Sequence, residues 1–165
     1  MYLVSKGIVN DVISDAYGKR GAVNEFGMPT CNFPIEILGV PPSIKSFALV
    51  LEDKDSAPSN GFCWIHWLAA NIKRNLIEEN ESASATDFIQ GANSWSSKFV
   101  GNNPVEKTCF YGGPSPHSGT HTYDLTVYAL DNDLDLKNGF YINELFKAMD
   151  GHILTKAALS GTYSS

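Results

Sequence analysis

Residues 44–72 read IKSFALVLEDKDSAPSNGFCWIHWLAANI, and this stretch decides the fold. Two runs rich in β-branched, aromatic and other apolar residues, Ile44–Asp53 and Cys63–Ile72, lie on either side of a segment of Ser, Pro, Asn and Gly. Runs of this length and composition are typical of strands, and the residues between them are turn formers. The stretch therefore predicts two strands separated by a turn.

Most of the chain repeats this pattern. Lys107–Tyr111 and His121–Leu130 are predicted to be further strands, and Gly or Pro turn signals recur along the sequence. Short strands separated by such turns indicate an antiparallel sandwich or barrel. No shift in composition marks a boundary, so residues 1–165 are expected to form a single, mainly β domain.

The last third of the chain departs from the strand pattern. Apolar residues recur at helical spacing from Ile142 to Met149, with Asn143 as the expected N-cap. Gly151 ends this pattern, and His152–Leu159 is expected to form a second short helical turn. The polar, acidic segment Glu78–Asp87 is expected to be a surface loop or a poor helix.

Charge and composition exclude several classes of protein. The chain has 12 Lys and Arg against 18 Asp and Glu, a net charge of -6, and no basic stripe, so no nucleic-acid binding is expected. No stretch approaches the roughly 18 apolar residues of a membrane span, so no integral membrane association is expected. The N-terminus lacks an export signal, and Cys31, Cys63 and Cys109 form no CxxC pair. A cytoplasmic protein with reduced thiols is therefore expected.

Titratable residues extend the apolar faces of three predicted strands. Alternate residues of a strand share a face. The predicted faces are Phe47, Leu49, Leu51, Asp53 and Asp55; Trp64, His66, Leu68, Ala70 and Ile72; and His121, Tyr123, Leu125, Val127 and Ala129. If the polar ends of these faces meet, they form a small cavity with two imidazoles, a carboxylate and aromatic walls.

The segment Tyr111–His121 (YGGPSPHSGTH) adds a stiff loop directly before the third strand. Backbone N–H groups in such a loop can form a concave site for an anion.

The titratable residues on the three predicted strand faces also have a purely structural interpretation. An inward His is often hydrogen-bonded in the core, Asp53 could cap a turn, and Tyr123 could be an ordinary core residue.

Other kinds of site fit the sequence less well. Metal sites usually show tighter spacing than these histidines and aspartates do, so no metal is expected. Ser115 lies in GPSPH rather than in a nucleophile elbow, so no catalytic nucleophile is identified. No nucleotide-binding loop or dinucleotide fingerprint occurs, and no cofactor is expected.

Five segments, in this order, resemble the phosphatidylethanolamine-binding proteins, in particular their bacterial Raf-kinase-inhibitor-like branch. They are Asp53–Pro58 (DKDSAP), Trp64–Trp67 (WIHW), Tyr111–Pro114 (YGGP), His121–Tyr123 (HTY) and Gly151–Tyr163 (GHILTKAALSGTY). The resemblance implies a sandwich of two antiparallel sheets with a few short peripheral helices. It also implies a pocket for phosphate, phosphorylethanolamine or a related anion. By motif, the implied ligand-binding residues are Asp53, Asp55, Trp64, His66, Gly113, Pro114, His121 and Tyr123.

The sequence also departs from the family pattern. Lys54 and Ser56 alter the family's DPDAP segment, and Ser115 stands where bacterial members often carry Cys. The segment that begins at Asn32 lacks the family's tryptophan. The helix that borders the pocket in animal members is expected to be missing, and kinase regulation is not transferred to this chain.

These observations favour a protein that binds a small phosphorylated or other anionic molecule. Protonated imidazoles and loop amides would hold the anion, with tighter binding as the pH falls from about 8 towards 6. The alternatives are a hydrolase of a small phosphoester or acyl substrate, with His66 or His121 as base, and a protein-interaction module. A homodimer is expected, because an apolar rim on an uncovered pocket favours self-association.

Overall fold

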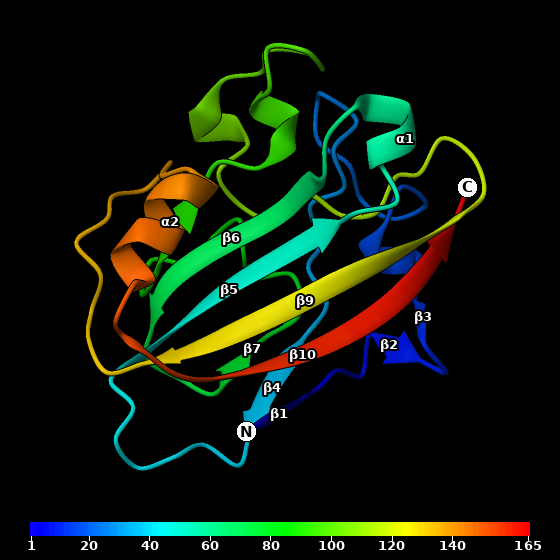
Figure 1. Cartoon of the computed structure of the whole chain (residues 1–165). Helices are drawn as coiled ribbons and strands as arrows, with labels where there is room; N and C mark the ends of the chain where they lie inside the picture. The colour runs from blue at the N-terminus through cyan, green and yellow to red at the C-terminus, as the bar shows by residue number, and fades with distance from the viewer.

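The computed structural model describes residues 1–165 and shows two β-sheets packed face to face (Figure 1). The larger sheet has the strand order β2 (Ile8–Val9), β3 (Val12–Ile13), β10 (Ile153–Ser164), β9 (Thr120–Leu130), β5 (Ser46–Asp53), β6 (Trp64–Ile72), β8 (Ile89–Gly91). The smaller sheet has the order β1 (Tyr2–Val4), β4 (Ile35–Leu38), β7 (Leu76–Ile77). All strand pairs are antiparallel except β10 with β3, which meet at Thr162 and Val12. The expected mainly β sandwich is confirmed.

Helices are few and short. They are η1 (Asp15–Tyr17), α1 (Ala57–Asn60), η2 (Ser94–Ser96), η3 (Val105–Lys107) and α2 (Ile142–Met149). Figure 1 shows α2 lying over one end of the larger sheet, while α1 lies at the opposite end of β5 and β6. No helix is long and apolar enough to cross a membrane.

The core consists of two clusters on opposite faces of the larger sheet. Between the sheets, Leu49 of β5 and Leu125 of β9 pack in one cluster with Ile35 of β4. On the outer face, Val50 of β5 lies in a second cluster with Leu145 of α2. Strand β5 is therefore buried on both faces, which explains why its sequence reads as a continuous apolar run.

Strand β6 contains two register irregularities. Leu51 pairs with Trp67 and Glu52 with Ile65, so His66 is an extra residue in the ladder. A second extra residue falls near Asn71, which has a φ of 61° and exchanges side-chain hydrogen bonds with the backbone of Leu134. Such bulges reverse the alternation of side chains along a strand.

The first bulge makes part of the predicted β6 face wrong. Leu68 and Ala70 lie in the outer cluster, whereas Trp67 and Ala69 lie between the sheets with Ile72. The extra residue leaves His66 on the inner side, where its ring meets that of Tyr123. The predicted faces of β5 and β9, which pair without a bulge between them, are correct from Phe47 to Asp53 and from Tyr123 to Ala129.

Three further predictions are wrong. His152–Leu159 is not helical but belongs to β10, because it pairs with β9 along nearly the whole of that strand. Lys107–Tyr111 is not a strand, because its backbone bonds to the loops around Asn93 and Ser82 instead of to a neighbouring strand. Helix α2 forms where expected, but its N-cap is Tyr141, whose N–H donates to the Glu144 side chain.

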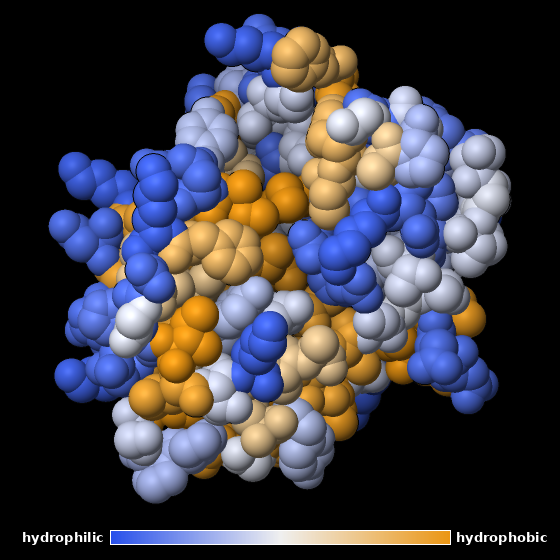
Figure 2. Space-filling view, in the orientation of Figure 1, coloured by the Kyte–Doolittle hydropathy of each residue, from blue (hydrophilic) through white to orange (hydrophobic).

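Apolar side chains remain at the surface of the outer face of the larger sheet (Figure 2). Phe146 on α2 packs against Tyr128, and it is 44% exposed. Ile153 and Leu154 at the start of β10 are exposed to a similar degree. This patch belongs to the α2 end of the sheet.

Candidate functional site

The end of β5, the start of β6 and the start of β9 meet at one edge of the larger sheet. Asp53 is the residue that joins them, because it pairs with Trp64 on one side and with Tyr123 on the other. A cavity of about 420 Å³ opens at this edge, within the size range of small-molecule sites. Seven of the eight predicted residues line it, and Pro114 does not.

Asp53 and His121 form a buried pair in this cavity. His121 Nδ1 lies 2.8 Å from Asp53 Oδ2, and the side chains are 16% and 5% exposed. The other carboxylate oxygen, Oδ1, accepts a hydrogen bond from the N–H of Ser56. Because a carboxylate only accepts, His121 Nδ1 carries a hydrogen and Nε2 remains without a protein partner.

His66 is fixed by the loop that follows Tyr111. Its Nδ1 donates to the carbonyl oxygen of Gly112 at 2.5 Å, and the N–H of Gly112 donates back to the carbonyl of His66 at 2.8 Å. Burial lowers the pKa of His66 to about 4, despite the nearby Asp53 carboxylate, which acts in the opposite direction. Without a bound anion, the His66 ring is therefore neutral at neutral pH.

The N–H groups of the two glycines in this loop bond to other parts of the protein. The N–H of Gly112 is used by His66, and that of Gly113 donates to Pro29 at 2.9 Å. A Cβ on Gly113 would come within 2.1 Å of the Tyr17 carbonyl oxygen, so this glycine is required for close packing. The backbone N–H groups without an acceptor in the protein lie further along the loop, at Ser115, His117 and Ser118. These three residues also line the cavity.

Three other polar groups at the cavity lack partners. Trp64 Nε1, Trp95 Nε1 and the Tyr123 hydroxyl are buried and form no hydrogen bond within the protein. Burial raises the pKa of Tyr123, so its phenol stays protonated and can donate. A buried donor without a partner costs about 1–3 kcal/mol, and native proteins rarely leave several together. Their concentration at one cavity indicates a place for a ligand or ordered water.

The formal charge of the cavity is negative. Asp53 and Asp55 line it, together with His66, His117 and His121, but no Lys or Arg does. The Asp55 carboxylate accepts a hydrogen bond from the N–H of Thr122 at 2.8 Å. No three His, Cys, Asp or Glu side chains come together in a way that could hold a metal ion.

Lys54 and Ser56, which alter the family's DPDAP segment, do not displace Asp53 from the cavity. Lys54 extends to Asp124 and Glu52, with Nζ–oxygen distances of 2.9 and 3.0 Å. The Ser56 hydroxyl lies 2.8 Å from the Asp53 carbonyl and 2.9 Å from the Phe62 carbonyl, which share its one hydrogen, and it accepts from the N–H of Trp64. Ser56 thus closes the turn between β5 and β6 through hydrogen bonds.

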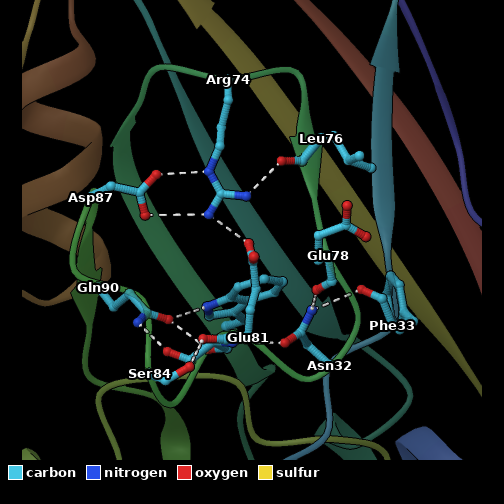
Figure 3. Close-up of polar contacts among 11 residues, drawn as sticks. Asn32, Phe33, Arg74, Leu76, Glu78, Glu81, Ser84, Asp87 and Gln90 are labelled. Atoms are coloured by element: carbon cyan, nitrogen blue, oxygen red, sulfur yellow. Dashed lines mark hydrogen bonds and ion pairs between the residues drawn. The ribbon is translucent and has the colours of Figure 1, made fainter.

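A buried network of hydrogen bonds fixes the residue that precedes the glycine loop. The Ser82 hydroxyl accepts from the N–H of Tyr111, the residue before Gly112, and donates to Gln90. Trp67 Nε1 donates to the same Gln90 oxygen at 2.8 Å. Figure 3 shows how Arg74 bridges Asp87 and Glu81 at the outer end of this segment. The predicted acidic surface loop is therefore anchored in the core through Ser82, which is 1% exposed.

Several cavity residues are not among the eight predicted ligand-binding residues. They are Ser56, Pro58, Ser59, Asn60, Trp95, Val100, Ser115, Pro116, His117 and Ser118. All come from turns and short helices, which carry no strand periodicity. Trp95 was detectable in principle, because a tryptophan inside the polar sequence NSWSS is unusual for a loop.

The three cysteines are free, and none of them lines the cavity. Burial raises the pKa of Cys31, Cys63 and Cys109, that of Cys63 to about 11. All three are therefore thiols at neutral pH and poor nucleophiles.

One cavity of the sandwich thus contains the imidazoles of His66 and His121, the Asp53 carboxylate, and residues of the WIHW and YGGP segments. The chain belongs to the phosphatidylethanolamine-binding protein family, whose sequence model matches residues 6–164. It is 41% identical to the uncharacterized protein YxkA of Bacillus subtilis over 155 residues, which cover 91% of this chain and 92% of that protein. A UPF0098 protein of Methanothermobacter thermautotrophicus is 38% identical over 135 residues, 79% of this chain and 80% of that one.

Solved structures agree with this membership. A Chlamydia trachomatis protein presented as a homologue of phosphatidylethanolamine-binding proteins superposes with a TM-score of 0.79 at 28% identity, covering 99% of this chain and 97% of that one. The Escherichia coli protein YbcL shares the fold, with a TM-score of 0.78 at 20% identity, covering 99% and 98% of the two chains.

Proposed function

We propose that the protein binds a small phosphorylated or other anionic molecule in the cavity between His66 and His121. The observation that carries the proposal is the set of buried, unpartnered donors at one cavity: two indole N–H groups and a phenol. An oxyanion is the ligand that can accept from many donors at once. Asp53 orients His121 by holding its Nδ1–H.

Calorimetric titration with inorganic phosphate and with phosphorylethanolamine tests this function. We expect binding by the unaltered protein and a loss of roughly 100-fold in affinity in His121→Ala, which removes a ligand-facing nitrogen and unpairs Asp53. The matched control is His152→Ala, because His152 also pairs with a carboxylate, that of Asp131, but lies outside the cavity. Equal affinities of the His121→Ala variant and the unaltered protein would contradict the proposal.

A second candidate is a hydrolase in which His121 acts as general base. The specific observation in its favour is the buried Asp53–His121 pair, the arrangement that orients a histidine base in many hydrolases. The Ser56 hydroxyl is committed to backbone carbonyls, so water is the nucleophile that this scheme requires. Turnover of p-nitrophenyl phosphate or acetate that disappears in His121→Ala but persists in His152→Ala would establish it.

We also propose a homodimer formed through the rim of the cavity. Val100 lines the cavity and is 37% exposed, and the adjacent Phe99 is 93% exposed. A phenylalanine so exposed favours contact with another apolar surface. Sedimentation should give a mass above 18.0 kDa for the protein, and a lower one for Phe99→Ser than for Phe146→Ser. A mass near 18.0 kDa at micromolar concentration would contradict the dimer.

The cytoplasmic location predicted from the sequence is part of the same proposal. Three free cysteines, with no disulfide among them, support a reducing compartment. Fractionation of cells that express the full-length protein tests the location directly.

A further inference from the structure

The cavity loop Pro114–Ser118 reads PSPHS, with a proline on each side of Ser115. Because proline has no backbone N–H, only Ser115 and His117 carry one between residues 114 and 117. Neither N–H has an acceptor in the protein, and both residues line the cavity. This part of the loop therefore has exactly two backbone donors to offer a ligand.

Lys19 holds the carbonyl groups of the same two peptide units. Its backbone N–H donates to the Pro114 carbonyl at 2.8 Å, and its Nζ donates to the Pro116 carbonyl, also at 2.8 Å. The Pro114 carbonyl shares a peptide unit with the Ser115 N–H. In the same way, the Pro116 carbonyl shares a peptide unit with the His117 N–H. One residue thus holds both peptide units that carry a free donor.

The planar peptide unit gives these contacts a direction. No peptide bond of the chain is cis, and in a trans peptide the C=O and N–H bonds point to opposite sides. Ser115 and His117 line the cavity, whereas Lys19 does not, so Lys19 approaches the loop from outside the cavity. Because the two carbonyls face Lys19, the N–H groups of Ser115 and His117 point away from it.

The start of the loop is fastened without the Lys19 side chain. The Tyr111 hydroxyl donates to the Tyr17 carbonyl at 2.8 Å, and the Gly113 N–H donates to the Pro29 carbonyl at 2.9 Å. The backbone bond of Lys19 also survives any substitution other than proline. Removal of the ammonium group therefore releases a single peptide unit of a loop that stays anchored.

The Lys19 ammonium group also carries a charge that no carboxylate neutralises. It forms no ion pair, unlike Lys54 and Lys73. A carbonyl that accepts from a cation polarises its peptide unit, which makes the N–H at the other end a stronger donor. No Lys or Arg lines the cavity, whereas Asp53 and Asp55 do. Lys19 thus supplies positive charge that reaches the cavity through the loop.

We propose that Lys19 is a positioning residue of the anion site, which turns the N–H groups of Ser115 and His117 towards the ligand and strengthens that of His117. This role rests on the proposed anion-binding function and adds to it a residue outside the cavity. Lys19 does not touch the ligand, so its effect passes through the peptide units that it holds. A purely structural residue would change stability without changing these two donors.

Calorimetric titration with inorganic phosphate at pH 7 tests the side chain. Lys19→Met keeps the backbone bond and the apolar stem but removes the ammonium group, so we expect roughly tenfold weaker binding. Lys19→Arg keeps a charged donor and should bind within about threefold of the unaltered protein. The matched control is Lys156→Met, which makes the same change of net charge at an exposed lysine outside the cavity and should keep the original affinity.

Amide chemical shifts give a readout that a merely structural role would not move. Saturating phosphate should shift the amide protons of Ser115 and His117 downfield in the unaltered protein, because an N–H bonded to an oxyanion forms a short, charge-assisted hydrogen bond. In Lys19→Met, the shift at His117 should fall to about half or less, because its peptide unit is neither held nor polarised. Lys156→Met should show the shifts of the unaltered protein.

The outcomes separate the role of Lys19 from the function of the site. If phosphate binds Lys19→Met as tightly as the unaltered protein, or binds without a downfield shift at Ser115 and His117, the role of Lys19 is overturned and the anion site stands. Weaker binding that Lys19→Arg does not restore, with both shifts unchanged, overturns it too. Absence of phosphate binding by the unaltered protein overturns the proposed function as well. If Lys19→Met does not fold, Lys19→Gln, which also removes the charge, replaces it in both measurements.

Discussion

The protein contains two histidine–aspartate pairs at opposite ends of β9. His121 Nδ1 lies 2.8 Å from Asp53 Oδ2, and His152 Nδ1 lies 2.9 Å from Asp131 Oδ1. The bond lengths are nearly equal, but the surroundings are not. The side chains of the first pair are 16% and 5% exposed, whereas those of the second are 41% and 47% exposed.

The two pairs therefore differ in their burial and their surroundings and not in the hydrogen bond itself. Asp53 also accepts from Ser56 and lines a cavity, whereas the Asp131 side chain bonds only to His152. In water the second pair is screened and costs little to separate. In the cavity the first pair holds the His121 ring with one nitrogen towards the carboxylate and the other free.

The largest expected difference between the two pairs is in the free energy of unfolding that is lost when the aspartate is removed. Asp53→Ala leaves His121 Nδ1 and the Ser56 N–H without an acceptor in a buried site, so we expect a loss of about 3 kcal/mol in the free energy of unfolding. Asp131→Ala should lose less than about 1 kcal/mol. Urea unfolding of the three proteins measures both values. Similar losses for the two variants would show that burial does not distinguish the pairs.

A smaller effect is expected from the pH dependence of stability, which involves His66. The pKa of His66 is about 4 in the folded protein, below the ordinary histidine value of 6.5. Between pH 4 and pH 6.5, the unfolded chain therefore binds a proton at His66 that the folded protein does not bind. Stability should therefore fall as the pH drops from about 6.5 towards 4, by about 2 kcal/mol from this group.

The matched variants for this test are His66→Gln and His152→Gln. The first should lose this part of the acid destabilisation, and the second should keep it, because it retains His66. Urea unfolding at pH 7 and pH 4.5 gives the difference. An identical pH dependence in His66→Gln and the unaltered protein would contradict the assignment.

The smallest change in the free energy of unfolding is expected when Lys54 is replaced, because its ion pairs are exposed to solvent, as is the Asp131–His152 pair. Its side chain is 63% exposed and contacts Glu52 and Asp124. Lys54→Ala should change the free energy of unfolding by less than about 1 kcal/mol and leave phosphate affinity unchanged. A larger loss would mean that exposed ion pairs contribute more here than the Asp131–His152 pair suggests.

The cavity residues that lie on regular strands could be predicted from the sequence. Strands β5 and β9 pair without a bulge, so alternation placed Asp53 and Tyr123 on the buried face correctly. Alternation failed on β6, because a bulge adds a residue that no pattern in the sequence marks. His66 was assigned to the inner side, but with the wrong neighbours, Leu68 and Ala70.

The unpredicted parts depend on contacts distant in the sequence. The stretch HILTKAAL contains good helix formers, and pairing with β9 overrides that local preference. Trp95 of η2 and Val100 of the turn that follows reach the cavity from a segment whose course depends on tertiary contacts. The neutral state of His66 could not be predicted either, because it follows from burial and from the Gly112 carbonyl.

The bulge in β6 has a consequence for how such a site can arise or disappear. Deletion of His66 would leave Ile65 opposite Glu52 and Trp67 opposite Leu51, the partners that they already have. The pairing of β5 with β6 therefore does not depend on this residue, whereas the position of the Gly112 loop does, because the ring and the carbonyl of His66 both bond to Gly112. A homologue whose strand is shorter by that single residue should keep the whole sandwich and lack the imidazole.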